Sequence, residues 1–146
     1  MSYKIFEYDK YLLPFEADIE LRMENYEKKL NSLVGDGGKL CDFANGHEYF
    51  GFHKTEDGWV YREWAPAADE LWLTGDMVGW RWFDLPMEAL GNGIFEVKMQ
   101  GRDFLYNGCH VKTIVRRGGE LLERIPLYAK RVVQDPNTAI WCAHSA

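Results

Sequence analysis

The spacing of apolar residues changes at a glycine-rich stretch, residues 35–38 (Gly-Asp-Gly-Gly), and this change limits the folds open to the chain. Before it, over residues 15–34, apolar side chains recur every three or four positions, which is the spacing of one face of an α-helix. Pro14 precedes this segment and the glycines follow it, as is common at helix boundaries. The sequence therefore predicts an amphipathic helix over residues 15–34. The apolar positions that define its face are Ile19, Met23, Tyr26, Leu30, Leu33 and Val34.

After the glycines the pattern becomes that of short β-strands separated by turns. The pairs Asp-Gly, Asn-Gly and Gly-Gly at residues 57–58, 107–108 and 118–119 are typical of turns between antiparallel strands. Short strands with turns about every eight to twelve residues are typical of a β-sandwich. We therefore predict a mainly β fold, an immunoglobulin-like antiparallel β-sandwich with an N-terminal α-helix. Residues 1–40 form the helical segment and residues 41–146 the sandwich. The predicted strands cover residues 48–52, 59–64, 70–74, 94–99, 109–115, 120–125 and 130–133.

Charge and cysteine content exclude several classes of protein. The chain has 17 basic and 23 acidic residues and a net charge of −6, whereas proteins that bind nucleic acid usually carry a basic surface. No stretch approaches the roughly 18 consecutive apolar residues of a membrane-spanning helix, and residues 1–4 do not lead into a secretory signal. Three cysteines with long, unequal spacings fit neither a disulfide framework nor a zinc site. We therefore expect a cytoplasmic protein with no nucleic-acid or membrane partner.

Catalytic and cofactor-binding motifs are missing from the sequence. The four histidines lack metal-ligand spacing, and neither a phosphate-binding loop nor a Gly-x-Ser-x-Gly nucleophile motif occurs. Asp76 and Asp84 flank a tryptophan-rich loop, but nothing in the sequence marks either carboxyl as an acid with a raised pKa. We therefore expect no cofactor, no metal and no catalytic residue in this chain.

One segment resembles a known family. A strand ending in Trp-Ala-Pro at residues 64–66 is followed by a strand that leads into Thr-Gly-Asp and then Gly-Trp at residues 74–80. This arrangement resembles the opening of a family 48 carbohydrate-binding module and the glycogen-sensing module of the AMP-activated protein kinase β subunit. Residues 6–14, 43–51 and 124–133 also resemble the N-terminal region of eukaryotic-type 1,4-α-glucan branching enzymes. Together these matches cover essentially the whole chain.

The resemblance implies that the chain is a non-catalytic part of a larger enzyme. Branching enzymes carry this region ahead of a (β/α)₈ barrel that holds the catalytic carboxylates, and such a barrel takes about 250 residues. The implied partners are this barrel, within the same enzyme, and an α-1,4-glucan such as glycogen or a malto-oligosaccharide. Two roles stay open. The region either binds glucan chains and positions them for the barrel, or braces the barrel with little glucan affinity of its own.

The resemblance also implies a glucan-binding site centred on Trp80. Sugars have apolar C–H faces that pack on an indole ring, and a curved α-1,4-glucan suits two or more aromatic rings set at an angle. In the glycogen-sensing relatives a lysine supplies a hydrogen-bond donor, and Lys112 matches it. A second tryptophan follows the next turn in those relatives, whereas Leu121 and Leu122 stand near that position here. Trp82 is the candidate substitute, which makes Trp80, Lys112 and Trp82 the expected glucan-binding residues.

Overall fold

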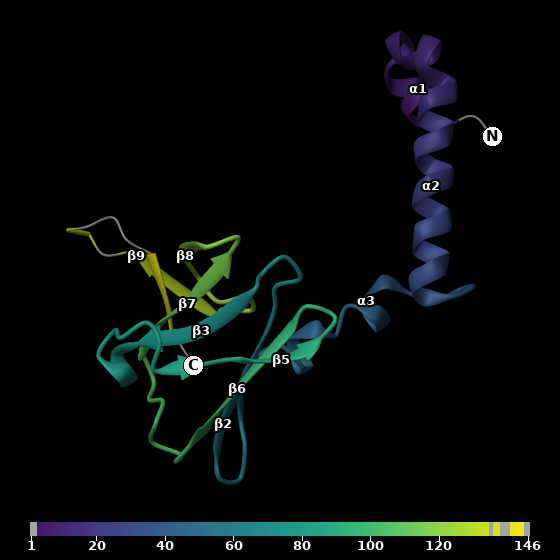
Figure 1. The fold of residues 1–146 in the computed structure, drawn as a ribbon. Helices are drawn as coiled ribbons and strands as arrows, with labels where there is room; N and C mark the ends of the chain where they lie inside the picture. Colours follow the sequence, from purple (N-terminus) through teal and green to yellow (C-terminus); the bar gives the residue numbers. More distant parts are fainter. Residues whose placement is uncertain (1–2, 135, 138–140, 145–146) are drawn as a thin grey trace. The chain divides into compact units, whose positions relative to one another are not determined.

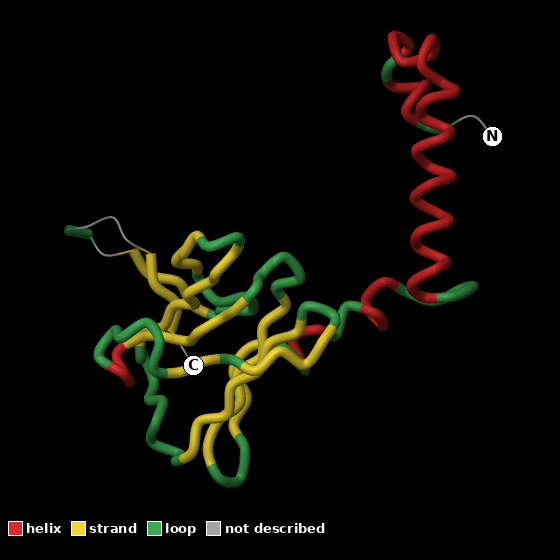
Figure 2. The backbone as a smooth tube through the Cα atoms, in the orientation of Figure 1, coloured by secondary structure: helices red, strands yellow, loops and turns green. Residues whose placement is uncertain are grey.

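The computed structural model describes residues 3–134, 136–137 and 141–144 of the chain. Two compact units are present, Met1–Asn45 and Gly46–Ala146 (Figure 1). The first unit is helical and the second is built mainly from β-strands (Figure 2). The described helices do not include one that is long and apolar enough to cross a membrane.

The N-terminal unit contains the predicted amphipathic helix. That helix, α2, spans Glu16–Val34, so the prediction for residues 15–34 is confirmed. It ends at Gly35, whose positive φ of 72° is easily reached without a Cβ and whose N–H donates to the Asn31 carbonyl oxygen at 2.9 Å. The shorter helices of this unit are α1 (Ile5–Tyr8), the 3₁₀ segment η1 (Lys10–Phe15) and α3 (Leu40–Phe43).

The second unit consists of two antiparallel sheets. The first sheet has the strand order β1-β2-β6-β5. The second has the order β4-β3-β7-β10-β9, with β8 also paired to β7. The strands are β1 (Gly51–Lys54), β2 (Gly58–Trp64), β3 (Glu70–Gly75), β4 (Leu85–Pro86), β5 (Glu88–Gly91), β6 (Ile94–Gln100), β7 (His110–Arg117), β8 (Glu120–Arg124), β9 (Arg131–Gln134) and β10 (Trp141–His144). Two 3₁₀ segments accompany them, η2 (Gly46–Glu48) and η3 (Asp76–Val78).

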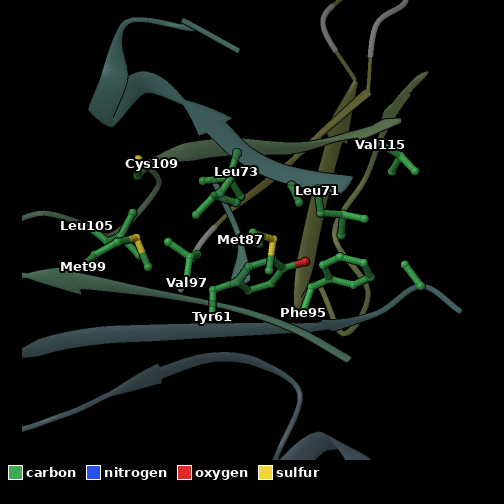
Figure 3. Packing of buried hydrophobic residues seen from close by; sticks show 13 residues of the cluster. Tyr61, Leu71, Leu73, Met87, Phe95, Val97, Met99, Leu105, Cys109 and Val115 are labelled. Atoms are coloured by element: carbon green, nitrogen blue, oxygen red, sulfur yellow. The ribbon is translucent and has the colours of Figure 1, made fainter. Parts of the chain in front are cut away.

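The core lies between the two sheets. Alternate residues point inward, so β3 contributes Leu71 and Leu73 while β6 contributes Phe95 and Val97 from the facing sheet. Figure 3 shows these side chains meeting around the ring of Tyr61. Two packed antiparallel sheets with a shared apolar interior form a sandwich. The predicted mainly β, immunoglobulin-like sandwich with an N-terminal helix is thus confirmed.

Strand β7 joins three other strands of the second sheet. One of its edges pairs with β3 from Val111 to Arg116. Its other edge is shared, because β10 pairs with His110 and Val111 while β8 pairs from Thr113 to Arg117. The partner along this edge therefore changes at Lys112.

One carboxylate is buried between the sheets. Glu63 on β2 has 0% of its surface exposed. The Tyr61 hydroxyl and the Arg124 guanidinium both donate hydrogen bonds to it, so the contact joins β2 to β8 across the sandwich. Burial raises the pKa of Glu63, although the hydrogen bonds from Tyr61 and Arg124 act in the opposite direction. This group therefore links the stability of the sandwich to pH.

The predictions from local sequence patterns were wrong or incomplete at several places. The predicted strand over residues 48–52 is wrong at its start, because residues 46–48 form η2 and β1 begins only at Gly51. The strands β4, β5 and β10 were not predicted. Tryptophans in strand patterns are usually buried or half-buried, which holds for Trp72 on β3, whereas Trp64 is exposed at the end of β2.

Candidate functional site

The loop after β3 presents Trp80 to solvent. The strand ends at Gly75, where a Cβ atom would strike the carbonyl oxygen of His110 on β7. The 3₁₀ segment η3 follows, and then Gly79 and Trp80 both adopt left-handed backbone conformations, with φ of 59° and 61°. The Trp80 N–H closes the loop by donating to the Gly75 carbonyl oxygen at 2.9 Å. This tight turn leaves the Trp80 side chain 39% exposed.

The carboxylate of Asp76 holds the Trp80 ring in place. Its Oδ1 accepts a hydrogen bond from the indole Nε1 at 3.0 Å. Its Oδ2 accepts from the backbone N–H of His110 at 2.8 Å and lies 3.0 Å from Nδ1 of the same residue. Partial burial would raise the pKa of Asp76, but these hydrogen bonds outweigh it and lower the pKa. Asp76 is therefore an ionised anchor and lacks the raised pKa that a general acid needs.

Trp80 forms one wall of a pocket on the outer face of the second sheet. The pocket has a volume of about 370 Å³. Val111 and Ala143 point into the core, so the alternation of side chains places their neighbours His110 and Cys142 on the outer face. The volume lies at the lower end of the range for small-molecule sites. The other lining residues are His110, Val133, Gln134, Pro136 and Cys142.

Lys112 lies two residues beyond His110 on β7, so it points to the same face of the sheet. Lys112 is largely buried, since only 7% of its surface is exposed. Its Nζ forms an ion pair with Oε2 of Glu123 on β8 at 2.6 Å. The structure thus brings two of the expected residues, Trp80 and Lys112, to one face of the sheet.

Trp82 belongs to a different group of aromatic rings. It is exposed and packs edge-on against Phe83, with ring centroids 6.4 Å apart. Phe83 in turn packs edge-on against Trp72 of β3 at 5.1 Å. The adjoining backbone is held by the Thr74 hydroxyl, which donates to the Arg81 carbonyl oxygen at 3.0 Å. Trp82 therefore lies at the border of an aromatic cluster over β3.

Two residues of this site had no assigned role in the sequence analysis. Asp76 was considered only as a catalytic carboxylate, and His110 only as one of four scattered histidines. The alternation along β7 was a usable signal for His110, because residues 110 and 112 share a face of the strand. The described residues contain no group of three His, Cys, Asp or Glu side chains placed to hold a metal ion.

Comparison with known proteins assigns the family. The family model "Carbohydrate-binding module 48 (Isoamylase N-terminal domain)" matches residues 49–138. The chain belongs to carbohydrate-binding module family 48. This family 48 module includes the whole Trp80 loop and strands β1 to β9.

Longer relatives match almost the whole chain. The module and its N-terminal unit are 34% identical over 138 residues to the 1,4-alpha-glucan-branching enzyme of Felis catus, covering 90% of this chain and 20% of that protein. The corresponding enzyme of Emericella nidulans is 37% identical over 140 residues, covering 92% of this chain and 20% of that enzyme. The chain thus spans about a fifth of the length of these relatives. The resemblance to the N-terminal region of branching enzymes is confirmed.

A solved structure supports the fold. The catalytic module of the multi-modular glycogen-degrading pneumococcal virulence factor SpuA superposes with a TM-score of 0.50 at 16% sequence identity. The match covers 78% of this chain and 17% of that one. At this identity the likeness concerns the arrangement of the strands, and it agrees with the sandwich described above.

Proposed function

We propose that this family 48 module binds α-1,4-glucan chains as the non-catalytic N-terminal part of a 1,4-α-glucan branching enzyme. The observation that carries the proposal is the exposed indole of Trp80, fixed by Asp76 at the wall of a 370 Å³ pocket. The similarity to branching enzymes points to the class of polysaccharide, and the covered fraction of those enzymes points to a further catalytic barrel.

The chemistry of the pocket suits a sugar. One glucose ring packs its C–H face on the Trp80 indole, an interaction that rigid aromatic side chains make at low entropic cost. His110 and Gln134 line the same pocket and carry groups that hydrogen-bond hydroxyls. Lys112 does not line the pocket itself, but it lies two residues from His110 on the same face of β7 and is the expected donor beside it. Its ammonium has three N–H groups, so the ion pair with Glu123 leaves donors for a sugar oxygen.

Trp82 takes a secondary place in this proposal. Its ring packs on Phe83 at the border of the aromatic cluster over β3, so it contacts a longer glucan only where the chain leaves the Trp80 pocket.

Binding to the module would serve catalysis by raising the local concentration of glucan chains near the barrel. Two sites joined in one protein convert the second binding event into an intramolecular one. The barrel supplies the chemistry of branch formation, and the module supplies substrate. A cytoplasmic location, where three thiols stay reduced, is part of the same proposal.

A calorimetric titration of the purified chain with maltoheptaose tests the proposal. The wild-type chain should bind saturably, and Trp80→Ala should weaken binding by more than tenfold, as expected when a central aromatic contact is removed. Trp59→Phe in the opposite sheet is the control and should bind like the wild type. Circular dichroism confirms that each variant is folded. Absence of binding at millimolar sugar would overturn the proposal and favour a module that only braces the barrel.

A further inference from the structure

A second exposed aromatic ring meets the carboxylate that anchors Trp80. Tyr106 is 54% exposed, and its hydroxyl oxygen lies 3.5 Å from Oδ2 of Asp76. The opposite oxygen, Oδ1, accepts the hydrogen bond from Trp80. Two aromatic side chains from loops far apart in the sequence therefore have their polar edges directed at one carboxylate.

The loop before β7 places Tyr106 at this end of the sheet. Tyr106 opens the turn into the strand, since the Cys109 N–H donates to the Tyr106 carbonyl oxygen at 3.0 Å. The turn depends on Gly108, which has a φ of 86°. The pairing of Gly75 with Val111 then brings this loop beside the end of β3, where Asp76 and the Trp80 turn begin.

We propose that Tyr106 is a second glucan-contacting residue, which packs on the sugar next to the one held by Trp80. The inference rests on the proposed function and extends it to the length of glucan that the site recognises. The contacts with Asp76 use the polar edges of the two rings, the indole Nε1 and the phenol oxygen, and both residues remain partly exposed, so C–H groups of sugars can reach the rings. Two aromatic rings that are both bound to the Asp76 carboxylate suit an α-1,4-glucan, because this chain turns from one glucose to the next.

Tyr106 fits this role better than Trp82. The ring of Trp82 packs against Phe83, which itself packs on Trp72, so this group covers β3. Tyr106 instead contacts the group that orients Trp80. The structure thus assigns the neighbouring sugar position to Tyr106, a residue that the sequence analysis did not consider.

A site with two aromatic contacts should depend on the length of the sugar. Maltose fills the Trp80 pocket and reaches Tyr106 only in part, whereas maltotetraose covers both rings. Removal of Tyr106 should therefore reduce the affinity for maltotetraose by about fivefold, the scale of one moderate aromatic contact. The affinity for maltose should change by less than about twofold.

Calorimetric titrations of the full chain with maltose and maltotetraose make the test. Tyr106→Ala should lose the gain in affinity with sugar length, and Tyr106→Phe should keep it because the ring remains. Tyr49→Ala is the matched control, since Tyr49 is an exposed tyrosine of the same unit that packs on Arg62 and Phe50. Thermal unfolding of each variant verifies that the fold is kept.

The outcomes separate this inference from the proposed function. If Trp80→Ala abolishes binding while Tyr106→Ala binds both sugars like the wild type, the assignment of Tyr106 is wrong and the function stands. Equal losses for maltose and maltotetraose in Tyr106→Ala would also overturn it, because Tyr106 would then act only by positioning Trp80. If Trp80→Ala binds normally, the proposed function itself fails.

Discussion

Replacement of Arg124 by alanine would leave the Glu63 carboxylate inside the sandwich without its counter-ion. Glu63 is fully buried, and the loss of one partner from a buried ion pair usually costs about 3–5 kcal/mol. The Arg124 side chain is 37% exposed, so water screens part of the interaction. Tyr61 and the backbone N–H of Leu127 also remain as donors to the carboxylate. We therefore expect the lower end of the range, about 3 kcal/mol at pH 8.

The cost of Arg124→Ala should depend on pH in a defined direction. The folded-state pKa of Glu63 lies above its ordinary value of 4.5 because of burial. A raised pKa stabilises the folded chain below the unfolded value, and this stabilisation is lost as the pH rises through the folded value. Loss of the Arg124 charge raises the folded pKa further, so Glu63 takes up a proton more readily. The destabilisation should therefore be about 1 kcal/mol smaller at pH 5 than at pH 8.

Urea unfolding followed by tryptophan fluorescence at both pH values measures these free energies. Glu63→Gln in the Arg124→Ala background removes the unpaired charge and should recover at least about 1 kcal/mol. Arg81→Ala, which breaks the exposed pair with Asp84, is the control and should cost less than about 1 kcal/mol. A cost for Arg124→Ala that is the same at both pH values, together with no recovery in the double variant, would refute the role of the buried charge.

Other substitutions test the Trp80 turn and the turn between β5 and β6. Asp76→Asn places an amide N–H₂ where a carboxylate oxygen accepts hydrogen bonds, so one acceptor is lost and the ring of Trp80 loosens. We expect a glucan affinity about fivefold lower by calorimetry, and wild-type affinity would contradict the anchoring role. Gly93→Ala adds a Cβ against Pro66 at a φ of 75°, whereas Gly91→Ala at φ 95° meets open space. In thermal unfolding, Gly93→Ala should lower the unfolding free energy by at least about 1 kcal/mol more than Gly91→Ala does. Equal losses of unfolding free energy in the two variants would exclude the clash with Pro66.

Local periodicity was sufficient for the elements with a strongly one-sided pattern. Helix α2 was predictable because its apolar residues keep a helical spacing for nineteen residues. Strand β5 was not, because all four of its residues are exposed and it carries no alternation. The exposure of Trp64 was predictable in principle. It has the same parity along β2 as Arg62, on the face opposite the buried Tyr61 and Glu63.

The site was predictable only in part. The family resemblance pointed to Trp80, and the loop indeed presents that ring to solvent. The convergence of Asp76, His110 and Tyr106 depends on the pairing of β3 with β7, which brings together residues about thirty positions apart. No local pattern specifies such a pairing, since it is decided by the packing of the whole sandwich.

The shared edge of β7 affects how binding data on variants should be read. His110 lines the Trp80 pocket at one end of this strand, and β8, which carries Arg124, is attached toward the other. An opening of β7 would therefore disrupt the pocket and expose the buried carboxylate in one event. A variant at Glu63 that never touches a sugar would still lower the apparent affinity near its melting temperature, because fewer molecules are folded. Conversely, a bound glucan should protect the far end of β7 against unfolding.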